Sequence, residues 1–255
     1  MNVVVCCKLV PDTEDVKVSA DGAIDLSRAH WKISDYDLQA IQAGVDIASQ
    51  TGGRVVALSV GGPLTNSSAL KKDVLSRGPE ELFQVVGDGL DDADTVTVCD
   101  ILAVAIERIG ADVVVCGEGS ADRYFQQAGI QLGERLGWAS VNAVNRIAVA
   151  DGALEVDRLL ENEIETLDVP MPAVLSTTTS INKPALPGMR AILGAAKKPQ
   201  IVWSLTDLSV ETSATVRVVS TVPPAEPDRK KIVFEAEPAE AAAKLVAALK
   251  QDGIL

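Results

Sequence analysis

Histidine and the cysteine pairs of metal and redox motifs are nearly absent from this sequence. Its 255 residues include one histidine, His30, and four cysteines, at positions 6, 7, 99 and 116, with no CxxC spacing. One histidine cannot build a multi-histidine metal site, and we expect it at the surface. The cysteines are best interpreted as small apolar residues in a reducing compartment. We therefore expect no metal site, with Cys6 and Cys7 pointing to opposite faces of one strand.

Large basic clusters and long apolar runs are also missing. The net charge is −13, and no basic cluster exceeds Lys71-Lys72, Lys197-Lys198 or Arg229-Lys230-Lys231, which argues against nucleic acid as a partner. No apolar run approaches the roughly 20 residues needed to cross a bilayer. The first residues, MNVVVCCKLVP, have the pattern of a strand and not of a signal peptide. We expect a soluble, cytoplasmic protein without membrane insertion.

Apolar strands alternate with helical patterns through the first half of the chain. Such alternation predicts an α/β fold with a doubly wound, mostly parallel sheet that helices cover on both faces. In the first expected helix, hydrophobic residues recur at helical spacing and Asp35 stands at the N-cap position. Strands are expected at 2–7, 55–60, 82–86 and 112–116, and helices at 35–49, 66–75, 95–109 and 125–136.

The pattern changes after Gly137. Strands expected at 141–149, 154–160 and 164–169 are separated by turn signals, which predicts an antiparallel meander attached to the sheet, followed by another strand from Pro172. From residue 199 onward prolines and charges are frequent, and one helix is expected at 239–250. We expect residues 1–198 to form the α/β nucleotide-binding domain. Residues 199–255 should form an extended C-terminal arm that lies on another surface, because the arm looks unable to bury its own apolar groups.

A glycine-containing loop, GEGSADRYFQQAG at 117–129, follows the expected strand at 112–116 and leads into a helix. Gly117 and Gly119 have no Cβ, so a phosphate could come close to main-chain N–H groups, near the positive end of the next helix. The loop is neither GxGxxG nor GxxxxGK[ST]. Glycines at such a junction are also common as simple turn residues. Nucleotide binding is therefore one interpretation of this loop and turn chemistry is the other.

Several motifs along the chain occur in a familiar order. They are Lys8-Leu-Val-Pro-Asp, ISDYDLQA from Ile33, the Gly117 loop, LDVPMPAV from Leu167, Ile181-Asn-Lys-Pro and MRAILGAAKK from Met189. This ordered set resembles the β subunit of electron transfer flavoproteins over essentially the whole chain. VGG at 60–62, KKDVLSRGP at 71–79, GEGSADRYFQQ at 117–127 and MRAILGAAKKP at 189–199 resemble the Fix-type branch most closely.

The resemblance implies an adenine-nucleotide α-hydrolase-like fold and a heterodimer with an α subunit that holds the redox-active FAD, to which this chain adds one wall. It also implies a nucleotide within this subunit, AMP in ordinary carriers or a second FAD in bifurcating ones. Ser34 and Asp35 replace the family's Asn-Pro, and Glu118, Arg123 and Tyr124 depart from its usual loop, so the choice between AMP and FAD stays open. The implied nucleotide contacts are Cys6, Ser34, Asp35, Tyr36, Asp37, Val60, Gly117, Glu118, Gly119, Ser120, Ala121, Asp122, Arg123, Tyr124, Phe125, Gln126, Gln127 and Ala128.

The resemblance also places a partner-recognition loop near 182–198, with Met189, Arg190, Ile192 and Leu193 contacting a dehydrogenase, a quinone oxidoreductase or a ferredoxin. Without the resemblance, the same stretch reads as a tight loop and helix. An electron carrier needs no catalytic residue, since the flavin supplies the chemistry, and we identify none. The alternative function is a stand-alone adenine-nucleotide sensor of the universal-stress type, which would have no use for this loop or for the proline-rich arm.

Overall fold

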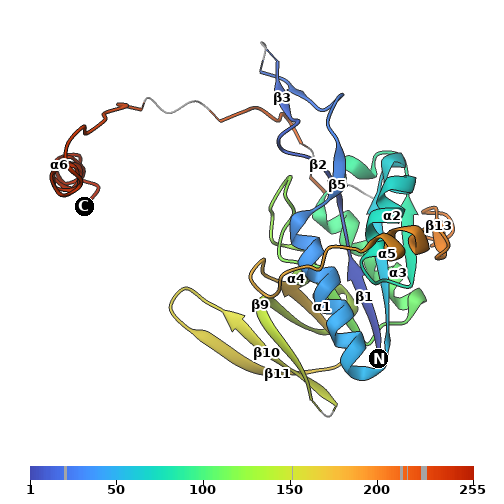
Figure 1. The fold of residues 1–255 in the computed structure, drawn as a ribbon. Helices are drawn as coiled ribbons and strands as arrows, with labels where there is room; N and C mark the ends of the chain where they lie inside the picture. Colours follow the sequence, from blue (N-terminus) through green and yellow to red (C-terminus); the bar gives the residue numbers. More distant parts are fainter. Residues whose placement is uncertain (20–21, 151, 213–214, 217, 225–228) are drawn as a thin grey trace. The chain divides into compact units, whose positions relative to one another are not determined.

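The structure is a computed structural model of residues 1–255, and it describes all of them except 20–21, 151, 213–214, 217 and 225–228 (Figure 1). Its contacts divide the chain into two compact units, Met1–Thr221 and Val222–Leu255. The first unit contains the sheet and the candidate site. Within the described residues, no helix combines the length and apolarity needed to cross a membrane.

A nine-stranded sheet with the order β11-β10-β9-β12-β8-β1-β6-β7-β13 forms the centre of the first unit. Strands β9, β12, β8, β1, β6, β7 and β13 run parallel, and β10 and β11 continue from β9 as antiparallel neighbours. The predicted meander and the mostly parallel sheet are thus confirmed, and β8 lies in the interior of that sheet between β12 and β1. The strands are β1 Asn2–Cys6, β6 Arg54–Gly61, β7 Glu81–Val86, β8 Val113–Gly117, β9 Ala139–Ala150, β10 Ala153–Leu159, β11 Ile164–Pro170, β12 Ala173–Thr177 and β13 Gln200–Trp203.

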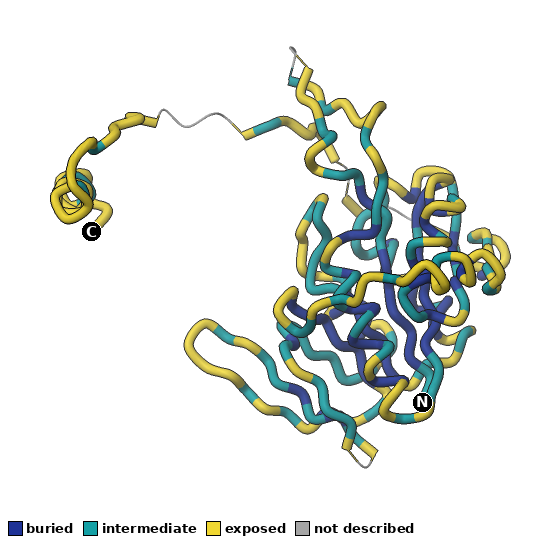
Figure 2. The backbone as a smooth tube through the Cα atoms, viewed as in Figure 1, coloured by how far each residue is buried: buried dark blue, intermediate teal, exposed yellow. Residues whose placement is uncertain are grey.

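Helices bury both faces of this sheet, as the doubly wound prediction requires. Val3 and Val5 of β1 pack in one core cluster with helix α1, and Val4 and Cys6 pack in the other with α3 and α4. Figure 2 shows the buried strands in dark blue between these layers. Cys7 lies on the face opposite Cys6. The helices of this unit are α1 Asp35–Thr51, α2 Ser68–Ser76, α3 Thr95–Ile109, α4 Ala128–Leu136 and α5 Met189–Ala195.

Shorter elements surround the carboxyl ends of the strands. The segment between β1 and α1 forms two small antiparallel pairs, β2 with β5 and β3 with β4. One 3₁₀ turn follows β6 and another follows β7. These elements are β2 Leu9–Pro11, β3 Lys17–Val18, β4 Ile24–Asp25, β5 Trp31–Ile33, η1 Pro63–Asn66 and η2 Leu90–Asp92.

One predicted N-cap and one predicted helix start were wrong. The N-cap of α1 is Ser34 and not Asp35, which is instead the first helical residue. Helix α4 begins at Ala128 and not near Phe125, because Tyr124 and Gln126 have φ angles of 47° and 57°, which a right-handed helix cannot contain. By contrast α3 has the predicted bounds, since its N-cap carboxylate, Asp94, accepts the Thr97 N–H at 2.8 Å.

The start of the predicted arm belongs to the sheet. Gln200–Trp203 pairs with β7 as strand β13, so Ile201, Val202 and Trp203 are sheet residues and not arm residues. The centroids of the Trp203 and Phe83 rings are 5.1 Å apart. The Arg108 guanidinium carbon lies 5.0 Å from the centroid of the Trp203 ring. The sequence could not show this, because the partner strand of an edge strand depends on residues far along the chain.

The second unit contains helix α6, Pro238–Gln251, close to its predicted bounds. None of its described residues is buried, and Leu245 and Val246 are about half exposed. The described residues of this unit therefore bury little apolar surface among themselves. Their packing against another protein stays a prediction.

Candidate functional site

A cavity of about 860 Å³ lies where the carboxyl ends of β1, β6, β7 and β8 meet. Residues at and shortly after the ends of these strands line it, including Lys8, Gly61, Asp91 and the loop from Gly117 to Arg123. Open α/β sheets bind ligands at this edge, where the loops of neighbouring parallel strands converge. The position is therefore that of a ligand site.

The cavity has an apolar extension formed by the segment between β1 and α1. Leu9, Val16, Ile24, Leu26 and Trp31 contribute its walls. Most of the charged and amide side chains of the lining come from the segments that follow β7 and β8. A ligand with one charged portion and one flat, apolar portion would match both parts.

Glycine at position 117 is required by close packing at the end of β8. A Cβ built there would lie 2.7 Å from Asp37 Oδ1 and 2.9 Å from the Tyr36 carbonyl carbon. A Cβ at Gly119 would overlap the ring of Tyr124, which itself packs against the Tyr36 ring with centroids 5.2 Å apart. The loop thus lies directly on the start of α1.

Asp37 is a buried carboxyl group at the base of the site. Its Oδ2 accepts the Lys8 N–H at 2.7 Å. Burial disfavours the charged form and raises its pKa to about 7, although hydrogen bonds from the Lys8 and Gly117 backbone act in the opposite direction. This side chain connects the end of β1 to the beginning of α1.

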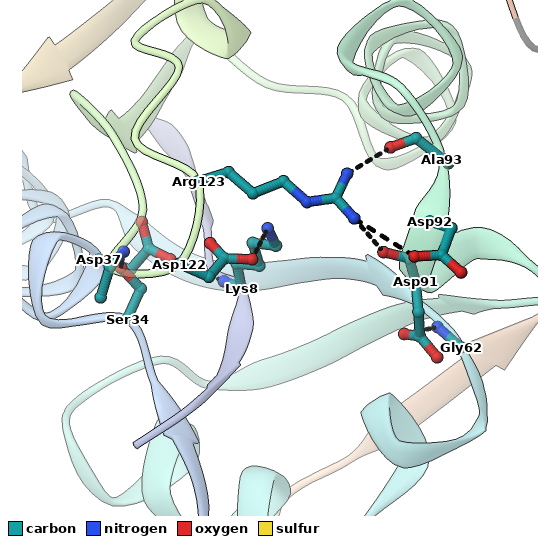
Figure 3. A network of polar contacts seen from close by, with 10 residues as sticks. Lys8, Ser34, Asp37, Gly62, Asp91, Asp92, Ala93, Asp122 and Arg123 are labelled. Atoms are coloured by element: carbon teal, nitrogen blue, oxygen red, sulfur yellow. Dashed lines mark hydrogen bonds and ion pairs between the residues drawn. The ribbon is translucent and has the colours of Figure 1, made fainter. Parts of the chain in front are cut away.

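Among the described residues, two cations line the cavity, and each already contacts a carboxylate (Figure 3). Lys8 Nζ lies 2.5 Å from Asp122 Oδ2. Partial burial alone would raise the pKa of Asp122, but hydrogen bonds from Lys8 and Ser120 outweigh it and lower that pKa. Arg123 lies 3.4 Å from Asp92 and donates to the carbonyls of Asp91 and Ala93.

Most of the residues predicted to contact a nucleotide line this one cavity. Ser34 does not: it is buried, and its Oγ accepts the Ala121 N–H at 3.3 Å. Asp35 is exposed and pairs with Lys32, and Tyr36 and Tyr124 pack on each other outside the lining. The predicted residues that do line the cavity are Cys6, Asp37, Val60, Gly117, Glu118, Gly119, Ser120, Ala121, Asp122, Arg123, Phe125, Gln126, Gln127 and Ala128.

Lys8, Asp91 and Asp92 also line the cavity, and the sequence reasoning did not assign them to it. Lys8 comes just after β1, and both aspartates lie in η2 after β7. Polar residues directly after the predicted strands were the signal that could have found them.

The cysteines of this unit are buried. Cys6 and Cys116 face the cavity floor from adjacent strands, and the hydrogen bond with Cys116, followed by burial, raises the pKa of the Cys6 thiol. Burial also raises the pKa of Cys99 to about 12. Thiols with raised pKa values are poor nucleophiles and metal ligands. Among the described residues, no group of three His, Cys, Asp or Glu side chains could hold a metal ion.

A sequence model of the electron transfer flavoprotein domain matches residues 21–208. The chain belongs to the electron transfer flavoprotein family. Proteins of this family are electron carriers that generally bind flavin and typically form heterodimers. The matched region covers most of the first unit, including the Gly117 loop and helix α5.

Replacing Asp37 with asparagine should remove a pH dependence of stability. In the wild type, burial raises the pKa of Asp37 from 3.8 to about 7, so the stability that this carboxyl group contributes is complete below pH 4 and is lost as the pH rises to 7. Asparagine cannot ionise. The unfolding free energy of wild type should therefore fall relative to Asp37→Asn by about 1.4 kcal/mol per pH unit in this window.

Denaturant unfolding at pH 4.5, 5.5 and 6.5 measures this difference. Asp46→Asn, at an exposed position of the same helix, is the matched control and should follow the wild type. Parallel curves for wild type and Asp37→Asn would show that the carboxyl group is ionised in the fold at pH 5.

Replacing Gly119 with valine should empty the site while leaving the sheet folded. The branched side chain would displace Tyr124 and occupy space beside the backbone that faces the cavity. Nucleotide released from the denatured protein would be quantified by chromatography, beside a melting curve. Gly188→Val is the control, since nothing lies within 4 Å of a Cβ there. Normal nucleotide content in Gly119→Val would remove this loop from the site.

Proposed function

We propose that this chain is the β subunit of a heterodimeric, Fix-type electron transfer flavoprotein. Its partner is an α subunit that holds the redox-active FAD, and the complex carries electrons between a dehydrogenase or NADH-side donor and a redox acceptor. The observation that supports this most directly is the cavity at the carboxyl ends of β1, β6, β7 and β8 in a chain of this family.

The cavity is proposed to hold an adenine nucleotide, AMP or a second FAD. The lining fits such a ligand, because Gly117 and Gly119 contribute backbone to the cavity wall and Lys8 places a positive charge there. Ligand pockets commonly measure about 300–1,000 Å³, and this cavity of about 860 Å³ has an apolar extension. These features favour the larger ligand, a second FAD.

A bound flavin would supply the redox chemistry, and the protein would position it. The Gly117 loop would bind phosphate through its backbone, and Trp31 and Leu26 would exclude water from the apolar extension. Burial raises the pKa of Asp37 to about 7, so this carboxyl group is only partly ionised at neutral pH. No acid, base or nucleophile of this chain is required.

Helix α5 is proposed to be the docking surface for the redox partner. Met189 is 71 % exposed and Leu193 67 % exposed, so neither is an intramolecular packing residue. Arg190 is exposed and Ile192 is half-buried. The preceding loop is fixed to α1, because Asn182 donates to the Gln39 carbonyl and the Ala185 N–H donates to Gln42. Exposed apolar side chains on a backbone held in place are suited to binding a protein partner.

Co-expression with the α subunit tests the assignment. A yellow one-to-one heterodimer should purify, and denaturation should release AMP or FAD in excess of the flavin of the α subunit. A colourless homodimer would contradict the assignment and favour a nucleotide sensor.

Truncation after Thr221 should abolish pairing but leave the first unit folded, whereas truncation after Lys198 should also destabilise the first unit by removing β13. Full pairing of the chain truncated after Thr221 would show that residues 222–255 are dispensable for pairing.

Replacing Met189 with alanine should weaken partner docking. The exposed side chain would lose buried contact worth roughly 1–3 kcal/mol at the interface and slow electron transfer by about ten-fold or more. Flavin content, subunit pairing and melting temperature should not change. Ile164→Ala, 60 % exposed on β11, is the control. Steady-state transfer to the cognate dehydrogenase decides: an unaltered rate would remove Met189 from the interface.

A further inference from the structure

Neighbouring residues of the loop between β8 and α4 are bound to opposite sides of the cavity (Figure 3). Asp122 accepts a hydrogen bond from Lys8, at the end of β1, at 2.5 Å. Arg123 extends the other way and donates to the carbonyl of Asp91 at 3.1 Å and that of Ala93 at 3.4 Å. The loop therefore joins two walls of the cavity that no backbone hydrogen bond of the sheet joins directly.

The turn that receives Arg123 is itself fixed. Asp91 Oδ1 accepts the Gly62 N–H at 2.8 Å, which connects η2 to the residue after β6. Polar contacts thus link the ends of β1, β6, β7 and β8 around the cavity. Any ligand that enters between η2 and the loop has to separate Arg123 from its acceptors.

The loop conformation depends on side-chain contacts. Tyr124 and Gln126 both lie in the left-handed region, which is unfavourable for residues other than glycine. Tyr124 is held there by the Tyr36 ring and by hydrogen bonds with Glu118 and Gln126. Opening the loop would release this backbone strain. The released strain would offset part of the free energy lost when the side-chain contacts break.

The Arg123 contacts are suited to a reversible closure. Its hydrogen bonds are long, at 3.1–3.4 Å, and the Asp92 side chain is 88 % exposed. Exposed ion pairs of this kind contribute little to stability. The bridge can hold the loop in place and still open on thermal motion.

We propose that residues 118–127 form a lid over the cavity and that Arg123 is the positioning residue that keeps the lid closed. This inference rests on the proposed nucleotide site. Arg123 then controls how fast an adenine nucleotide enters and leaves, by way of its contacts with the η2 turn.

Kinetics distinguish a lid residue from a residue that only binds phosphate. Removing a bond that closes a lid lowers the barrier to opening, so association and dissociation both accelerate and the dissociation constant changes little. Removing a phosphate contact accelerates dissociation alone and weakens binding in proportion. The two roles thus differ in the association rate.

The experiment uses the full heterodimer and two probes, AMP and FAD. The dissociation rate is measured by exchange against excess isotope-labelled probe, and the dissociation constant is measured by titration. The association rate constant is the dissociation rate constant divided by the dissociation constant. Arg123→Gln should accelerate both rates about three- to ten-fold, with the dissociation constant within about two-fold of wild type. Arg123→Lys should restore part of the closure. Asp92→Asn should accelerate both rates less, because Arg123 keeps its two carbonyl acceptors.

Arg135→Gln, at an arginine that pairs with Asp100 away from the cavity lining, is the control and should match wild type. Faster dissociation alone in Arg123→Gln, or unchanged rates, would overturn the lid. If wild type binds neither AMP nor FAD, the nucleotide site itself is overturned. Should Arg123→Gln melt early, Arg123→Lys and Asp92→Asn provide the same test.

Discussion

Parallel pairing of β1 with both β6 and β8 is the constraint on which the rest of the structure depends. Val5 lies opposite Ala57 on one side and Val115 on the other, and helices bury both faces of these strands. Because the strands run in one direction, their carboxyl ends meet at one edge. Loops that are distant in sequence therefore form one cavity, and the hydrophobic core that fixes the register also fixes the position of each polar side chain there.

Charge at the cavity is limited by the acidic character of the chain. Asp37, Asp91, Asp92, Glu118 and Asp122 line it, against the cations Lys8 and Arg123. Burial raises the pKa of Asp37 to about 7, which reduces the repulsion that a phosphate would meet from this carboxyl group. Because both cations already contact carboxylates, phosphate binding has to rely largely on backbone N–H groups or exchange one carboxylate for the ligand.

Hydrogen bonds hold the α5 segment and the last part of the first unit to the rest of that unit. Lys198 Nζ donates to the carbonyls of Leu75 and Pro79 at 2.8 and 2.7 Å, so the residue that ends the α5 segment is bound to the end of α2. Farther on, Asp94 caps α3 and also accepts the N–H groups of Thr215 and Val216. Thr215 and Val216 are thus bound to the start of α3, shortly before the first unit ends at Thr221.

The sequence by itself determined the α/β class, the meander and the bounds of α3, because apolar runs that need burial and a capping aspartate act locally. It also located the Gly117 loop. Only the tertiary structure decided where α4 begins, since the Tyr36 ring supports the left-handed Tyr124, and that Gln200–Trp203 completes the sheet beside β7. It alone showed that Lys8 contacts Asp122 and that Asp91 contacts Gly62, because the separation of two residues along the chain does not indicate which strand ends lie side by side.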